Sequence, residues 1–98
     1  MAGDWIKIRN ALPDDPDVMR LSDILGVDDD AIVGKLVRFW SWADRYTVDG
    51  AKLALTAERI DRLVGLPGFA EGLREIGWLD GEDVDLKMPN IERQNGNA

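Results

Sequence analysis

The side chains best suited to acid–base, nucleophilic or metal chemistry are missing from this sequence of 98 residues. It contains no His and no Cys, so the usual neutral-pH proton carrier, the commonest metal ligand and the thiol nucleophile are all absent. No Ser has a histidine base to activate it, and no glycine-rich phosphate-binding pattern occurs. We expect no catalytic site, no cofactor and no enzymatic activity.

Carboxylates are abundant, yet their spacing fits helix starts and turns better than a metal site. The run Asp28–Asp30 lacks the alternating ligands and the glycine of a calcium-binding loop. It is predicted to begin a helix, where negative charge complements the helix dipole. A second acidic group is predicted to surround a solvated turn, and it comprises Asp80, Glu82, Asp83 and Asp85. No metal site is expected.

The charge balance limits DNA binding. Twelve Lys and Arg against nineteen Asp and Glu leave a net charge of −7, whereas proteins that bind duplex DNA gain most of their nonspecific affinity by neutralising phosphates. A local basic strip is compatible with this balance, and its candidate phosphate contacts are Lys52, Arg59, Arg62, Arg74, Lys87 and Arg93. The alternative is that Arg59 and Arg62 pair with Glu58 and Asp61 on a solvated helix face.

Four tryptophans are many for a chain of this length. Trp40 and Trp78 lie among apolar neighbours and are predicted to be core residues. Trp42 is expected on the shoulder of its helix beside two arginines, with much of its indole exposed, and this combination is favoured at protein interfaces. The predicted partner interface consists of Trp5, Arg38, Trp42 and Arg45. Ordinary packing under the N-terminal arm is the alternative.

Capping residues and apolar periodicity predict the helices that position these side chains. The first begins at Asp14-Asp15-Pro16, with Ile24 among its apolar positions, and ends at Gly26. The central helix begins at Asp28–Asp30 and carries an apolar stripe to Tyr46. The third is capped by Thr56 and stopped by Gly65, and the fourth covers residues 68–76.

Short strands are expected at residues 51–55 and on both sides of the turn Gly81-Glu82, over residues 78–80 and 83–88. The order of elements then predicts an α+β, mostly helical class: a winged helix, in which a helix-turn-helix pair precedes a two- to three-stranded β wing. Residues 1–98 are read as one domain, with an extended N-terminal arm at 1–12 and a flexible polar tail at 90–98. The helix at 68–76 would enter the major groove, but Glu71 and Glu75 on its outward side make it a poor reader.

Several short runs of this sequence resemble one family in both content and order. The runs are Gly3–Ile8, Gly34–Trp42, Ile60-Asp61 ahead of Gly65–Phe69, Gly77-Trp78-Leu79 and Pro89–Gly96. Together they resemble the N-terminal winged-helix domain of phage and prophage replication proteins of the DnaD-like, replisome-organiser type. The resemblance implies a module linked to the start of DNA replication that works largely by self-association, while a separate C-terminal part carries much of the DNA affinity.

We therefore expect a non-catalytic module that acts mainly through self-association or by docking a replication or host protein, with at most weak DNA contact. Two alternatives stay open: a sequence-specific DNA-binding transcriptional regulator, and a small acidic phage protein that inhibits a host nucleic-acid-binding factor. No apolar run approaches the roughly 20 residues of a membrane span, and the start lacks the features of a signal peptide. A cytoplasmic protein of a bacterial cell or phage-infected host, without a small-molecule substrate or membrane partner, is expected.

Overall fold

A computed structural model describes residues 8–46 and 55–81 of the chain. Predictions for residues 1–7, 47–54 and 82–98 lie outside the described residues. They concern Trp5, Lys52, Lys87 and Arg93, the polar tail and most of the predicted strands. The described residues form a short 3-10 helix, η1 (Leu12–Asp14), followed by the α-helices α1 (Pro16–Leu25), α2 (Asp29–Tyr46), α3 (Ala57–Val64) and α4 (Phe69–Glu75).

Side-chain caps set the starts of α1, α2 and α3, as the sequence predicts. The Asp15 carboxylate accepts a hydrogen bond from an amide of the first turn of α1 at 2.8 Å. Asp28 accepts one in the same way for α2 at 3.1 Å, and Thr56 Oγ1 does so for α3 at 3.2 Å. The first amides of a helix have no partner within it, so these bonds favour helix initiation at those residues.

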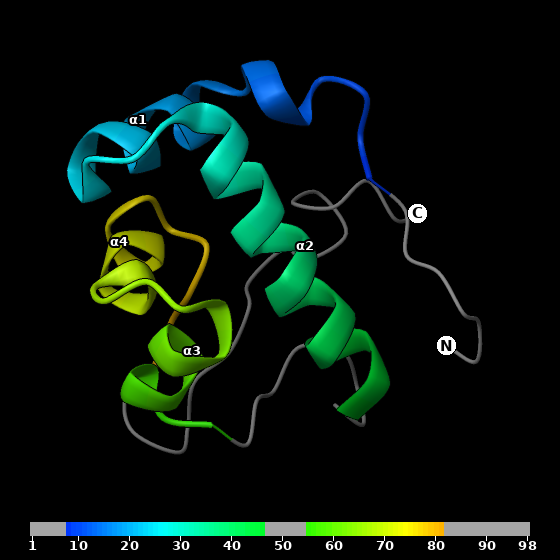
Figure 1. Ribbon diagram of the computed structural model, residues 1–98, viewed down its shortest axis with the longest axis vertical. Coiled ribbons are helices and arrows are strands. Elements are labelled where there is room, and N and C mark those ends of the chain that lie inside the picture. Colours follow the sequence, from blue (N-terminus) through cyan, green and yellow to red (C-terminus); the bar gives the residue numbers. More distant parts are fainter. Residues whose placement is uncertain (1–7, 47–54, 82–98) are drawn as a thin grey trace.

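Helix α2 lies along one side of the described structure, and the other three α-helices lie together on its other side (Figure 1). Both α1 and α3 pack against α2, and each also packs against α4. The short helix η1 also packs against α2. The buried residues of α2 form its inner face toward the core, and its exposed residues, among them Asp30, Gly34 and Arg38, form its outer face.

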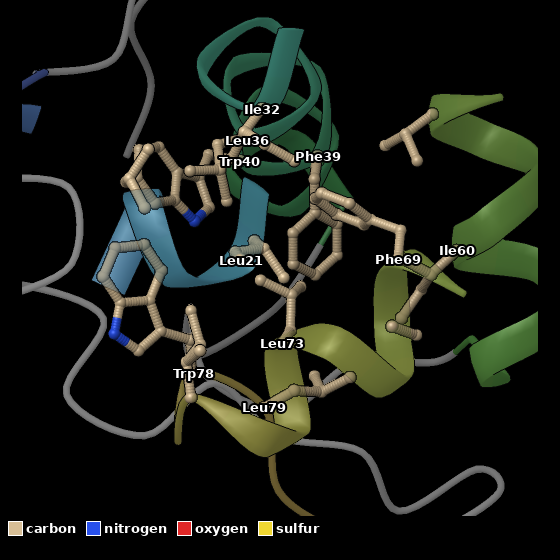
Figure 2. Packing of buried hydrophobic residues seen from close by; sticks show 14 of the residues in the cluster. Leu21, Ile32, Leu36, Phe39, Trp40, Ile60, Phe69, Leu73, Trp78 and Leu79 are labelled. Atoms are coloured by element: carbon tan, nitrogen blue, oxygen red, sulfur yellow. The ribbon is translucent and has the colours of Figure 1, made fainter. Parts of the chain in front are cut away.

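Aromatic contacts form the centre of the core on the inner face of α2 (Figure 2). Phe39 meets Phe69 of α4 edge to face, with ring centroids 6.3 Å apart, and Trp40 stacks on Trp78 with centroids 6.2 Å apart. Trp40 and Trp78 are both buried, which confirms their predicted core positions. The largest fully buried side chains are Trp40, Phe39, Phe69, Leu12, Leu21, Ile32, Leu36, Ile60 and Leu73.

Two polar contacts fasten the start of α1 to segments distant in the sequence. The Trp78 indole N–H donates a hydrogen bond to Asp17 Oδ2 at 3.3 Å, which connects the turn after α4 to the first turn of α1. Arg9 Nη2 lies 2.9 Å from Asp15 Oδ2, so the residues before η1 are also held against this helix start. Both carboxylates that begin α1 thus contribute to tertiary structure.

The winged-helix fold class is wrong for this structure. Among the described residues all secondary-structure elements that have bounds are helical, and residues 78–80, predicted as the first strand of the wing, are irregular apart from a single bridge position at Asp80. Gly77 has a φ of 84°, and the Trp78 amide donates to the Leu73 carbonyl at 2.8 Å, closing the end of α4. That amide is therefore unavailable to a strand, and Trp78 and Leu79 are both buried rather than alternating.

Three further expectations also need correction. Residues 1–12 were predicted to form an extended arm, but η1 begins at Leu12, and Leu12 is fully buried. Ile24 and Tyr46, which share the apolar spacing of their helices, are exposed. Each lies in the last turn of its helix. Periodicity thus predicted the helices better than it predicted which end residues reach the core.

Candidate docking surface on helix α2

The predicted phosphate contacts that fall within the described residues are three arginines, and two of them lie beside carboxylates. Arg62 Nη2 is 3.4 Å from Glu58 Oε2 on the exposed side of α3. Arg74 is half-buried, with its Nε 3.8 Å from Glu71 Oε1. Arg59 is exposed and makes no side-chain ion pair with a described residue. Neighbouring carboxylates reduce the attraction of this surface for phosphate.

Asp61 has a different role from the pairing with arginine that the sequence suggested. Its carboxylate accepts hydrogen bonds from the Gly68 amide at 3.0 Å and from the Ala70 amide at 2.8 Å. These amides lie at the start of α4, which has no cap from its own Gly68. A side chain of α3 thus caps the next helix and fixes the turn between them. The short turn Gly65–Gly68 is the sequence signal that could have indicated it.

The predicted partner interface is partly assembled on α2. Arg38 and Arg45 are exposed, as an interface requires, but Trp42 is half-buried and packs against the core rather than presenting much of its indole. Its ring centroid lies 5.3 Å from that of Tyr46. Tyr46, which was predicted to be inward, is 59% exposed and is the residue that sequence reasoning missed.

We call Trp42, Arg45 and Tyr46 the aromatic end of α2. The Arg45 guanidinium lies 5.8 Å from the Tyr46 ring centroid, within the range of a cation–π contact. Arg45 also lies in the last turn of α2, where a cation is favourable to the helix dipole. Tyr46 therefore contacts a half-buried indole and a guanidinium, while more than half of the residue stays accessible.

The described residues hold no group of three or more His, Cys, Asp or Glu side chains placed to bind a metal ion. None of their helices combines the length and the apolar character that crossing a membrane requires. The surface features of α2 are an exposed aromatic ring and guanidinium groups, which suit recognition of a partner's apolar and acidic groups.

Comparison of this chain with protein-family models, with curated proteins and with solved structures finds no match. The resemblance to phage and prophage replication proteins therefore stays a prediction, and the geometry of the described residues is the basis for the functional inferences that follow.

Proposed function

We propose that this chain is a non-catalytic docking module that contacts another protein through the aromatic end of α2. The observation that carries the proposal is Tyr46, which is 59% exposed although it contacts Trp42 and Arg45. Tyrosine, tryptophan and arginine are enriched at the centres of protein interfaces. Because neighbouring side chains already hold the ring, less conformational freedom is lost when a partner covers it.

The chemistry of this surface favours a partner with an acidic, partly apolar face. Arg45 is exposed beside Tyr46, while the chain as a whole carries a net charge of −7. A local positive charge on an acidic protein attracts acidic surfaces only in one orientation, so it gives specificity more than affinity. Binding is expected to weaken as salt concentration rises.

The sequence resemblance supports placing this docking step in a phage or prophage assembly that starts DNA replication, with a replication or host protein as partner. Direct DNA contact is proposed to be weak. The carboxylates beside Arg62 and Arg74 support that view because they offset the charge available to phosphates.

The docking proposal is tested by site-specific crosslinking in cells that contain the partner. A photoreactive benzoylphenylalanine replaces Tyr46 in one variant and Met19, which is 43% exposed on α1, in a matched control. We expect a discrete adduct, identified by mass spectrometry, from position 46 only. The adduct should disappear with Arg45→Glu and persist with Arg20→Glu. Equal adducts from both positions, or insensitivity to Arg45→Glu, would contradict the proposal.

The DNA alternative is tested by fluorescence anisotropy with labelled single- and double-stranded DNA at low and at physiological salt. The proposal predicts weak binding at low salt that fades at physiological salt. Tight, sequence-dependent binding that Arg59→Glu with Arg62→Glu removes would instead favour a DNA-binding regulator.

A further inference from the structure

The described helices contain two interior glycines, and packing among the described residues explains only one of them. Gly72 of α4 is buried, and a Cβ placed there would lie 2.6 Å from Leu21 Cδ1. Gly34, in the middle of α2, is exposed, and a Cβ placed there would meet no atom of the described residues within 4 Å. Glycine weakens a helix interior relative to almost every other residue. No contact in the described part of the chain therefore accounts for glycine at position 34.

Opposite charges flank Gly34 on the same face of the helix. Asp30 precedes it by four residues and Arg38 follows it by four, a spacing that places all three along one exposed stripe. Neither charged side chain makes an ion pair with a described residue. Helix periodicity places the stripe on the opposite side of α2 from its buried residues Ile32, Leu36 and Phe39.

We propose that a second copy of this chain docks on this stripe, with the two α2 helices antiparallel and a two-fold axis at Gly34. The symmetry places Asp30 of each chain opposite Arg38 of the other, and it brings the two Gly34 backbones together. Glycine at the crossing point lets two backbones approach closely, which accounts for the residue. A parallel pair would instead place Asp30 against Asp30 and Arg38 against Arg38, so the charges select the antiparallel arrangement.

The neighbouring residues fit the same symmetry. Ala31 lies three residues before Gly34 and Val37 lies three residues after it, on opposite sides of the stripe. Both are half-buried in the single chain. The two-fold axis brings Ala31 of one chain to Val37 of the other, which adds apolar contact on each side of the crossing. Because this pairing uses residues 30–38, it stands apart from the proposed function and leaves Trp42, Arg45 and Tyr46 open.

Cysteine crosslinking tests this arrangement directly because the natural chain has no Cys. A mixture of Asp30→Cys and Arg38→Cys chains is expected to form a disulfide-linked dimer under mild oxidation, because one Asp30–Arg38 pair and both glycines remain in the mixed dimer. Arg20→Cys on exposed α1 is the matched control. Asp30→Cys alone should not crosslink, because its two copies would lie about 12 Å apart along the helix axis, beyond disulfide reach. A mixture of Asp30→Cys and Arg38→Cys chains that links no faster than Arg20→Cys would overturn the proposal.

Charge exchange provides a second test without any crosslink. Light scattering of the unmodified chain up to millimolar concentration should approach twice its mass of 10.9 kDa. Asp30→Arg or Arg38→Asp alone should raise the dissociation constant about 10-fold, and the double variant should restore it to within about threefold, because unlike charges again face each other. Circular dichroism checks that each variant keeps its helices. A monomeric natural chain, or a double variant weaker than both singles, would refute the pairing, whereas the Tyr46 crosslink tests the docking surface separately.

Discussion

The two helix-interior glycines mark two regions that look alike in sequence and differ in structure. At Gly72 the seam between α1 and α4 is closed, and Leu21 occupies the space that a side chain would need. Gly34 is exposed on the outer face of α2, and no atom of the described residues comes within 4 Å of the same hypothetical carbon. Packing among the described residues explains Gly72 and does not explain Gly34.

The difference extends to the residues around each glycine. The contact between α1 and α4 contains side chains that are fully buried, such as Leu21 and Leu73. The outer face carries an exposed aspartate and arginine without ion pairs to described residues. The last turn of α2 adds an accessible Tyr46. The inner residues therefore determine stability, and the outer ones point to association. Substitutions on the two sides should separate these effects.

The largest expected effect is on the inner side of α2. Phe39→Ala removes a ring that is 1% exposed and packed edge to face on Phe69. The free energy of unfolding should fall by about 3–5 kcal/mol because of the lost burial and the cavity left behind. Urea denaturation followed by circular dichroism measures it. A loss below that of the milder Phe39→Leu would contradict the described core.

Gly72→Ala tests the closed seam. The added Cβ would lie 2.6 Å from Leu21 Cδ1, and Leu21 is fully buried, so the neighbour must shift. We expect a loss of about 1–2 kcal/mol, since overpacking outweighs the better helix propensity of alanine. The companion variant Leu21→Val in the Gly72→Ala background should recover part of this loss. An increase in stability from Gly72→Ala alone would show that the seam is looser than described.

Asp61→Ala tests how the turn between α3 and α4 is fixed. Removing the carboxylate leaves the amides of Gly68 and Ala70 without their acceptor. The free energy of unfolding should fall by about 1–2 kcal/mol. Asp61→Asn should lose less, because one of the two amides can keep an oxygen acceptor. Equal stability of the natural chain and Asp61→Ala in urea denaturation would count against this cap.

Gly34→Ala is expected to act in the opposite direction from Gly72→Ala. In dilute solution, where the chain is monomeric, stability should rise by about 0.5–1 kcal/mol because alanine favours a helix interior. Self-association, measured by light scattering, should weaken because the added methyl groups separate the two backbones. A variant that is less stable when dilute would indicate a contact to Gly34 within the single chain.

The smallest effect on stability is expected from Tyr46→Ser. The ring is 59% exposed, so its loss should change the free energy of unfolding by less than about 0.5 kcal/mol. Binding of the partner identified by crosslinking should nevertheless fall sharply, since the main accessible aromatic surface is gone. Calorimetric denaturation and a binding titration on the same sample compare the two readouts, and a large stability loss would place Tyr46 in the core instead.

Helix boundaries could be predicted from the sequence because their signals are local. Asp15 and Thr56 accept hydrogen bonds from nearby amides, and Gly26 and Gly65 end helices α1 and α3. These interactions need only a few consecutive residues, so one sequence suffices to locate them. Trp40 and Trp78 were also placed correctly in the core, because each lies among apolar neighbours.

The errors concern features set by contacts distant in sequence. Trp78 was predicted to begin a strand, but its amide closes α4 and its indole binds Asp17, 61 residues away. Asp61 looked like a partner for arginine because periodicity does not show that the next helix start lies within its reach. None of these facts is encoded within one turn of helix.

The central claim, that the outer face of α2 associates while its inner face stabilises the fold, is tested most directly on the unmodified chain. Amide proton–nitrogen spectra are recorded from dilute to millimolar concentration. The account predicts concentration-dependent shifts centred on Ala31, Gly34 and Arg38, with the amides of α3 and α4 little changed. Spectra that do not depend on concentration, or shifts centred on the turn between α3 and α4, would contradict it.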